Sequence, residues 1–377
     1  MTIIAVTRET RTNETRVAAT PETAKKLIAA GFQVTVEAGS GTAASYPDAD
    51  YEAAGATLAK TAKAAIEGAD ILFKVRAPVD EEIAALKSGA IVAAGLNPYV
   101  EKAALKALAD KGATAFAMEF IPRITRAQVM DMLSSQANLA GYRAVIEGAE
   151  AYGKAMPMMM TAAGTVAAAK VFIMGVGVAG LQAIATARRL GAVVTATDVR
   201  PATKEQVESL GAKFIAVEDE EFKNAQTAGG YAKEMSAEYQ AKQAELISGH
   251  IGKQDIVITT ALIPGRPAPK LVSAAQVASM KPGSVIVDLA IEQGGNVEGG
   301  KLGEVAVTAN GVKLLGKPNL PGRIAADASA LYARNLFAFA GLLLDKEGKF
   351  APDYEDEILK AAMVTQGGKI LRSELFA

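Results

Sequence analysis

Three glycines, Gly175, Gly177 and Gly180, follow an apolar run and open a stretch with helical periodicity. In a strand–turn–helix unit, the first glycine of this G-x-G-x-x-G pattern permits a tight turn, the second lets the backbone approach a pyrophosphate, and the third lets the helix pack on the strand. Free N–H groups at the start of the helix attract phosphate. Asp198 ends the next apolar run, 23 residues after Gly175, where a carboxylate accepts hydrogen bonds from ribose hydroxyls. The pattern predicts a dinucleotide site, and the alternative is a packing turn without a ligand.

Asp198 also bears on which dinucleotide binds. Its carboxylate should repel a 2′-phosphate, which favours NAD over NADP. Arg200 is a residue type that accommodates a 2′-phosphate and therefore points the other way. A carboxylate about 4 Å from that phosphate would cost on the order of several kcal/mol at a surface-like dielectric, so we expect NAD.

A polar segment places Arg123, Arg126, Gln128 and Asp131 at the start of an expected connecting helix. Such side chains can contact a ligand in a cleft. Arg and Asp near a helix start more often form caps and solvated ion pairs, and this structural role is the alternative.

Two other segments have less specific patterns. Residues 227–233 include Gly230 and Tyr231 in a long stretch between strands, which suits either a mobile lid or an ordinary surface loop. His250, the single histidine of the chain, lies among glycines, and we expect it in a solvent-exposed turn rather than at a catalytic centre.

The composition excludes several kinds of chemistry. The 377 residues include no Cys and one His, which excludes disulfides, thiolate nucleophiles and Cys- or His-rich metal sites. Lys plus Arg (40) nearly balance Asp plus Glu (41), so we expect no binding of nucleic acid. Apolar residues make up 50% of the chain, enough for buried cores. The N-terminus has no signal-peptide pattern, so the expected compartment is the cytoplasm.

Alternating strands and helices must position these residues. Strand, helix and strand follow one another over the first 120 residues, and the alternation restarts at residue 171, which predicts parallel sheets covered by helices. In the first set we expect strands at 3–6, 33–37, 71–75, 90–94 and 115–120, and helices at 21–30, 80–86 and 97–112. In the second set we expect strands at 171–174, 193–197, 214–217, 256–260 and 285–289, helices at 180–190 and 205–210, and a hairpin or tight connection at 305–315.

The expected fold class is α/β, with two doubly wound parallel-sheet (Rossmann-like) domains joined by long helices and a cleft between them. Residues 1–135 and 330–377 form the first domain, to which the C-terminal segment returns, and residues 136–329 form the NAD-binding domain. A linker helix at 126–152 and a second long helix capped by Asp327 make the connections.

Residues 155–187 carry a single charge, on Lys170, and are long enough to span a bilayer. Pro157, four glycines and the mid-span lysine instead favour a buried strand followed by a helix. We therefore expect no membrane span.

Four motifs occur in order along nearly the whole chain: residues 122–143, the glycine pattern at 175–180 with Asp198-Val199-Arg200, GGYAKEM at 229–235 and TTALIPG at 259–265. Together they resemble the NAD(H)-binding alpha component of proton-translocating nicotinamide nucleotide transhydrogenase. The resemblance implies a catalytic role at the nicotinamide end for Gln128, Arg123 and Asp131, with Ser134 beside them. It implies that the phosphates and adenosine are held by Gly177, Val178, Asp198, Val199 and Arg200, together with Gly175 and Gly180 of the glycine pattern. It also implies closure over the cofactor by Gly230, Tyr231 and Leu262.

The same resemblance implies NAD(H) on this chain and NADP(H) on a partner component. A second partner would be the membrane-spanning proton-channel component. The chain itself would be a homodimer without metal, located in the cytoplasm and peripheral to the inner membrane through its partners.

ETRVA at 14–18 and LFKV at 72–75 also resemble alanine dehydrogenase, a relative of this family. That enzyme has a catalytic His where this chain has Ala94-Gly95-Leu96, and a catalytic Asp where it has Glu292. Amino-acid oxidation needs a proton acceptor, whereas hydride transfer between two nicotinamides moves no proton. We therefore expect hydride transfer from NADH to NADP⁺. The alternatives are a soluble NAD-dependent, alanine-type dehydrogenase and a non-catalytic NAD-sensing module.

Overall fold

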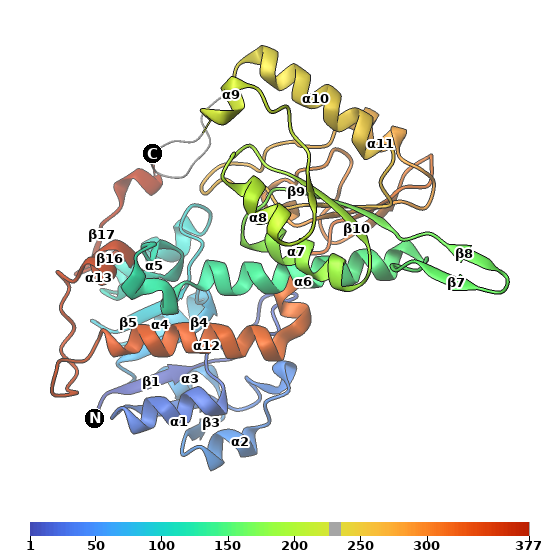
Figure 1. Cartoon of the computed structure of the whole chain (residues 1–377). Helices are drawn as coiled ribbons and strands as arrows, with labels where there is room; N and C mark the ends of the chain where they lie inside the picture. Colours follow the sequence, from blue (N-terminus) through green and yellow to red (C-terminus); the bar gives the residue numbers. More distant parts are fainter. Residues whose placement is uncertain (226–234, 377) are drawn as a thin grey trace. The chain divides into compact units, whose positions relative to one another are not determined.

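The structure, a computed structural model of the chain, describes residues 1–225 and 235–376 (Figure 1). The chain divides into two compact units: unit 1 comprises Met1–Gln136 and Pro321–Ala377, and unit 2 comprises Ala137–Leu320. The sequence predicts the domain boundaries at 135/136 and 329/330. Each unit contains its own sheet, and both sheets are dominated by parallel strands, so the predicted α/β class with two doubly wound domains is confirmed.

Unit 1 is built on an eight-stranded sheet. Its strands are β1 (Ile3–Val6), β2 (Gln33–Glu37), β3 (Thr57–Ala59), β4 (Ile71–Arg76), β5 (Ile91–Gly95), β6 (Thr114–Ala117), β16 (Met363–Gln366) and β17 (Lys369–Ile370). Their order is β17-β16-β6-β5-β4-β1-β2-β3, parallel from β6 to β3. The tail adds β16 and β17 as antiparallel strands, so it lies on the first domain as predicted.

Helices cover both faces of this sheet. They are α1 (Pro21–Ala29), α2 (Asp48–Ala53), α3 (Ala62–Ile66), α4 (Asp80–Ala85), α5 (Lys102–Asp110), α12 (Ala325–Gly341) and α13 (Glu357–Ala362). Along β4, Phe73 packs in the core with α1 and α12, whereas Leu72 packs in the core with α3, α4 and α5. This alternation, with both faces buried, is what a parallel sheet between two helical layers requires.

Unit 2 contains a seven-stranded sheet in the order β11-β10-β9-β12-β13-β15-β14. Its strands are β9 (Lys170–Met174), β10 (Val193–Thr197), β11 (Lys213–Phe214), β12 (Ile256–Thr259), β13 (Val285–Asp288), β14 (Val305–Val307) and β15 (Lys313–Leu315). The helices are α6 (Met132–Tyr152), which begins in unit 1, α7 (Val178–Arg189), α8 (Thr203–Ser209), α9 (Glu220–Lys223), α10 (Ala237–Ile251) and α11 (Ala274–Ser279). All strand pairs are parallel except β14 with β15, the connection predicted at the sheet edge.

Several element boundaries differ from the prediction for local reasons. The strand expected to run to residue 120 ends at Ala117, because the Glu119 carboxylate, rather than strand backbone, accepts the N–H groups of Leu96 and Asn97. The helix expected from residue 97 begins at Lys102, since Asn97 has a φ of +47° and starts a turn. Asp327 lies in the first turn of α12 and is not its cap, which is Ile324.

The long uncharged stretch at 155–187 does not form one helix. It contains β9 and most of α7, the predicted buried strand and helix, preceded by a hairpin of β7 (Met159–Thr161) and β8 (Gly164–Val166) that the sequence analysis missed. The hairpin projects beyond its own sheet with every strand residue exposed (Figure 1). In the parts of the chain that the structure describes, no helix has the length and apolar character to cross a bilayer.

Unit 1 buries an ion cluster at the carboxyl ends of β1 and β4. Glu14 accepts hydrogen bonds from Arg16 Nη2 at 2.7 Å and from Arg76 Nε at 2.9 Å, and its side chain is 2% exposed. Burial acts to raise the pKa of Glu14, but the hydrogen bonds and charges of Arg16 and Arg76 outweigh it and lower the pKa to about 2. Arg16 also donates to Gln136 Oε1 at 2.8 Å, which ties the N-terminal loop to the start of α6.

We expect the Glu14 pairing to make unit 1 acid-sensitive. A carboxyl group whose pKa is lowered on folding contributes stability above its unfolded pKa and loses it as the pH falls toward the folded value. A pKa about 2 against an ordinary 4.5 corresponds to on the order of 3 kcal/mol, lost between about pH 5 and pH 2. Urea unfolding of Glu14→Gln should show a shallower pH dependence in this window than the unmodified chain. Glu52→Gln, at an exposed position of the same unit, should not. Equal slopes for Glu14→Gln and the unmodified chain would refute the assignment.

Helix α6 packs closely on unit 2 through glycine. A Cβ at Gly141 would lie 2.0 Å from the carbonyl oxygen of Ala179 in the first turn of α7, and one at Gly148 would lie 3.1 Å from Ile256 Cγ2. These two positions, seven residues apart, let the α6 backbone approach α7 and the sheet directly.

Gly141→Ala should therefore destabilise unit 2 despite the higher helix propensity of alanine. The added methyl group meets backbone, so we expect a loss of about 1–3 kcal/mol in the free energy of unfolding, measured with urea. Gly249→Ala is the matched control, because it lies inside α10 with nothing within 4 Å of its Cβ position. It should stabilise the chain by up to about 1 kcal/mol. A Gly141→Ala variant as stable as Gly249→Ala would contradict the packing argument.

Candidate functional site

The three predicted glycines form the turn between β9 and α7, which we call the fingerprint turn (residues 175–180). Gly175 has a φ of +101°, and a Cβ there would lie 2.5 Å from Thr260 Oγ1. A Cβ on Gly180 would lie 1.9 Å from the Gly175 carbonyl oxygen, so α7 begins directly against the turn. At Gly177 no described atom lies within 4 Å of the Cβ position, and its backbone faces open space. These geometries match the tight turn, the open approach and the close helix packing that the glycine pattern predicts.

The fingerprint turn lies where the strand order reverses. β9 has β10 on one side and β12 on the other, so the crossovers from β9 and to β12 leave on opposite sides. In open α/β sheets, ligands bind at the carboxyl ends of the strands at such a point. Among the described residues no side chain caps α7, whose N-cap is Gly177, so the first N–H groups of the helix are available to an anion.

Asp198 follows β10 and contacts the fingerprint turn. Its Oδ2 accepts the Val176 N–H at 2.7 Å, and its Oδ1 accepts the Arg200 N–H at 2.9 Å. The Arg200 side chain closes on the same carboxylate, with Nε 2.9 Å from Oδ1 and Nη2 2.9 Å from Oδ2. The structure thus brings together three of the predicted cofactor positions, the glycine turn, Asp198 and Arg200.

Apolar side chains are exposed at the ends of these same neighbouring strands. Val178 after β9 is 39% exposed, Val199 after β10 is 54% exposed, and Leu262 after β12 is 47% exposed. Because carboxyl ends of parallel neighbours meet at one sheet edge, these side chains border the fingerprint turn and offer apolar surface to a ring or a sugar.

The loop that carries Leu262 is braced from below by two residues that the sequence analysis missed. Asn296 accepts the Ala261 N–H at 3.1 Å and donates to the carbonyl oxygens of Ala261 and Pro269 at 2.9 and 2.8 Å. Asp288 in turn accepts the Asn296 N–H at 2.7 Å and the Thr259 hydroxyl at 3.2 Å. Asp288, a carboxylate ending an apolar strand, was visible in the sequence, whereas nothing local distinguishes Asn296.

The other predicted site residues lie in unit 1. Arg123 and Gln128 are exposed. Asp131 accepts the N–H and the hydroxyl of Ser134 at 2.9 and 2.6 Å, and so caps the start of α6. Arg126 pairs with Asp356 at 2.8 Å, as in the structural alternative for this segment.

Helix α12 holds this segment in place. Asn335 donates to the Val129 carbonyl oxygen at 2.8 Å and accepts the Ser135 hydroxyl at 2.8 Å. Gln136 donates to the Ala328 carbonyl oxygen at 3.1 Å. The backbone around Gln128, which belongs to η3 (Thr125–Met130), is thereby fixed while its side chain stays exposed.

Two further segments with predicted roles lie elsewhere. Gly230 and Tyr231, the predicted lid, lie outside the described residues. His250 was expected in an exposed turn, which is wrong: it occupies the last turn of α10, because helix α10 continues through Gly249 to Ile251.

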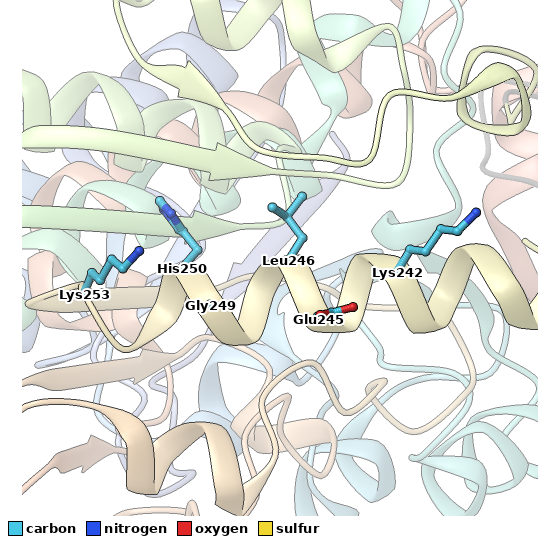
Figure 2. Close-up of a pocket in the computed structure, with 6 residues that line it drawn as sticks. All are labelled: Lys242, Glu245, Leu246, Gly249, His250 and Lys253. Atoms are coloured by element: carbon cyan, nitrogen blue, oxygen red, sulfur yellow. The ribbon is translucent and has the colours of Figure 1, made fainter.

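The surroundings of His250 indicate a packing role. Its Nε2 lies 2.8 Å from Thr195 Oγ1, and its ring meets Phe172 edge-on at 4.8 Å. Burial and the charges of Lys253, Lys213 and Lys170 lower its pKa. A shallow hollow runs along this part of α10, with Lys242, Leu246, His250 and Lys253 on one side of the helix (Figure 2). None of the predicted cofactor residues lines this hollow.

The site can therefore hold a dinucleotide but offers little acid–base chemistry. Within residues 1–225 and 235–376, no cluster of His, Asp or Glu has the arrangement of a metal site. The groups present suit binding and orientation of a phosphate-linked, ribose-containing ligand.

Comparison with known proteins agrees with this description. Residues 5–140 match the family model for the alanine dehydrogenase/PNT N-terminal domain, and residues 144–373 match that for the C-terminal domain. An NAD(P) transhydrogenase alpha subunit of Rhodospirillum rubrum is 53% identical over 378 residues, covering 99% of this chain and 98% of the relative. The crystal structure of transhydrogenase from Sinorhizobium meliloti superposes with a TM-score of 0.90 at 56% identity, covering 98% of this chain and 100% of that one.

Alanine dehydrogenases are more distant relatives. That of Halomonas elongata is 31% identical over 373 residues, covering 97% of this chain and 94% of the relative. The predicted family resemblance is therefore confirmed: the chain belongs to the family that comprises the alpha subunits of NAD(P) transhydrogenase and the alanine dehydrogenases.

Proposed function

We propose that this chain is the NAD(H)-binding component of a proton-translocating transhydrogenase and passes hydride from NADH to NADP⁺ held by a partner component. The observation that carries the proposal is the Asp198 carboxylate bonded to a G-x-G-x-x-G turn at the switch point of the unit 2 sheet. High identity to NAD(P) transhydrogenase alpha subunits supports the choice of reaction.

The reaction itself asks little of protein acids and bases. Hydride leaves C4 of the dihydronicotinamide ring of NADH and bonds to C4 of the NADP⁺ ring, giving NAD⁺ and NADPH without release of a proton. The protein must align the rings and exclude water. A chain with one histidine and no cysteine can do both.

The residues divide into two groups. The N-terminal N–H groups of α7 and the glycines of the fingerprint turn bind the pyrophosphate, and Asp198 binds the adenosine ribose. Val178, Val199 and Leu262 supply apolar contact beside the Asp198–Arg200 pair. Gln128, Arg123 and Asp131, with Ser134, contact the nicotinamide end, where the cap at Asp131 keeps the start of α6 rigid. The lid at Gly230 and Tyr231 stays a prediction.

The remaining parts of the assembly are also proposals. The partner that holds NADP(H) is a separate component, and a membrane-spanning component couples hydride transfer to proton movement. The chain forms a homodimer and is peripheral to the inner membrane on its cytoplasmic side.

An alanine-type dehydrogenase is the alternative, favoured by the identity to alanine dehydrogenases. The relevant position at the end of β5 argues against it. A Cβ on Gly95 would lie 2.7 Å from the Val75 carbonyl oxygen, and Leu96 is buried. No imidazole stands at this position to accept the proton that amino-acid oxidation releases.

We expect calorimetry to show NADH binding at least roughly tenfold more tightly than NADPH, because a 2′-phosphate would approach the Asp198 carboxylate. Asp198→Asn keeps the side-chain size but removes the charge, and it should shrink the ratio. Asp110→Asn, at an exposed position in unit 1, should leave it unchanged. Equal affinities in the unmodified chain would exclude this chain as the NAD(H)-binding component.

We expect Gln128→Asn to slow hydride transfer more than it weakens binding. A displacement of about 1 Å in ring alignment can cost roughly a hundredfold in rate. Stopped-flow absorbance, with an NAD analogue whose reduced form absorbs apart from NADPH and a purified NADP-binding component, measures the rate at saturation. The NADH affinity should change by less than about threefold, since other residues hold most of the cofactor. Gln33→Asn, on the exposed side of β2, is the control.

Two outcomes would count against these assignments. Weaker NADH binding with an unchanged saturating rate would leave residues 122–131 with a structural role alone. Reduction of NAD⁺ by alanine with the chain alone, without any partner component, would favour the dehydrogenase.

A further inference from the structure

The carboxylate of Asp198 has all of its hydrogen-bonding capacity occupied in the structure. An ionised carboxylate offers about four lone pairs, two on each oxygen. Oδ1 accepts the backbone N–H and the Nε of Arg200, both at 2.9 Å. Oδ2 accepts the Val176 N–H at 2.7 Å and Arg200 Nη2 at 2.9 Å. A ribose that is to donate to this carboxylate must first displace a donor.

The four donors are not equally easy to displace. The N–H groups of Val176 and Arg200 belong to the backbone that shapes the fingerprint turn and the end of β10. The Nε and Nη2 donors belong to one side chain, which is 33% exposed and can rotate toward solvent. Two parallel N–H donors from a guanidinium meet the two carboxylate oxygens just as the two O–H donors of a vicinal diol would.

We propose that the Arg200 guanidinium occupies the position of the adenosine ribose in the unliganded protein, and that NADH binding displaces it from Asp198. This inference rests on the proposed function, since it assigns the ribose to Asp198. Arg200 then tunes cofactor affinity as a competitor of the ribose hydroxyls and is not one of the groups that hold NADH most tightly.

Further contacts are consistent with this role. Arg200 Nη2 also lies 3.2 Å from the Val176 carbonyl oxygen, so the guanidinium is seated directly on the fingerprint turn. The hydrogen bond and charge of Asp198 raise the pKa of Arg200, as expected for a cation that gains a partner. The pair keeps a mostly buried carboxylate, 6% exposed, from standing without a counter-charge when no cofactor is bound.

The displaced side chain also affects selectivity between the two cofactors. Once free of Asp198, the guanidinium lies near the ribose 2′ position, where it would pair with the phosphate of NADPH. Arg200 therefore opposes NADH binding and assists NADPH binding. Removing it should sharpen the preference for NADH, the reverse of what a residue holding NADH would do.

Calorimetry of the full chain with Arg200→Ala tests the proposal. NADH should bind about three- to tenfold more tightly than to the unmodified chain, since a partly exposed ion pair no longer has to be broken. NADPH should bind more weakly, by a similar factor. Reduced nicotinamide mononucleotide, which lacks the adenosine, should bind equally to both proteins. Arg189→Ala, with the same charge change at the exposed far end of α7, should change none of these affinities.

Two further measurements keep the proposal falsifiable if Arg200→Ala folds poorly. Arg200→Lys keeps the charge but cannot offer two parallel donors, so NADH should again bind more tightly, by a smaller factor. A crystal structure of the unmodified chain with NADH should place the guanidinium more than about 4 Å from Asp198 and the ribose hydroxyls in its place. Weaker NADH binding by Arg200→Ala, or an intact Arg200–Asp198 pair in the NADH complex, would overturn the inference. Failure of the unmodified chain to bind NADH would instead overturn the proposed function.

Discussion

The fingerprint turn exists because no side chain separates Gly175 from Gly180, where a Cβ would lie 1.9 Å from a carbonyl oxygen. The neighbouring strands then fix the turn from both sides. Met174 is in register with Thr197 on β10 and with Thr259 on β12, so the residues that follow, Gly175, Asp198 and Thr260, meet at one level of the sheet. Asp198 accepts the Val176 N–H, and Thr260 donates to the Gly175 carbonyl oxygen at 2.9 Å. A shift of either strand by one residue would remove its contact with the turn, which makes sheet register the condition for the nucleotide site.

Unit 1 positions its exposed residues by a different means. The segment around Gln128 has little regular structure, and its stability comes from side chains that bond to backbone. Asn335 of α12 holds Val129, and the Asp131 and Ser134 pair starts α6. The C-terminal part of the chain is thus needed for the geometry of residues 125–136, although these lie some 200 residues apart in sequence. This arrangement leaves Gln128 exposed on a rigid backbone, which suits a residue that must align a ligand without deforming.

The sequence was sufficient for most of the fold, since period-two and helical patterns with glycine stops depend on local chemistry. It also located Asp198, because a strand end 23 residues after the first glycine is a geometric relation along the chain. It could not locate Asn296 or Asn335, whose partners are separated by 35 and 206 residues and which carry no local signal. His250 was misplaced for a similar reason. The glycines around it suggested a turn, but helix packing on Phe172 and the bond to Thr195 outweigh the low helix propensity of glycine.

The treatment of charge links the two units to the proposed chemistry. Unit 1 keeps Glu14 ionised between two arginines, and unit 2 keeps Asp198 beside Arg200, so these carboxylates enter the structure with a cation already in place. Paired groups of this kind bind and orient but do not readily exchange protons, because the partner holds the charged form. A ring-to-ring hydride transfer has no proton to exchange and loses nothing by this arrangement. Under the proposed function, the groups that take up and release the translocated proton must therefore belong to the membrane component, and this chain contributes to coupling through when and how firmly it binds NADH.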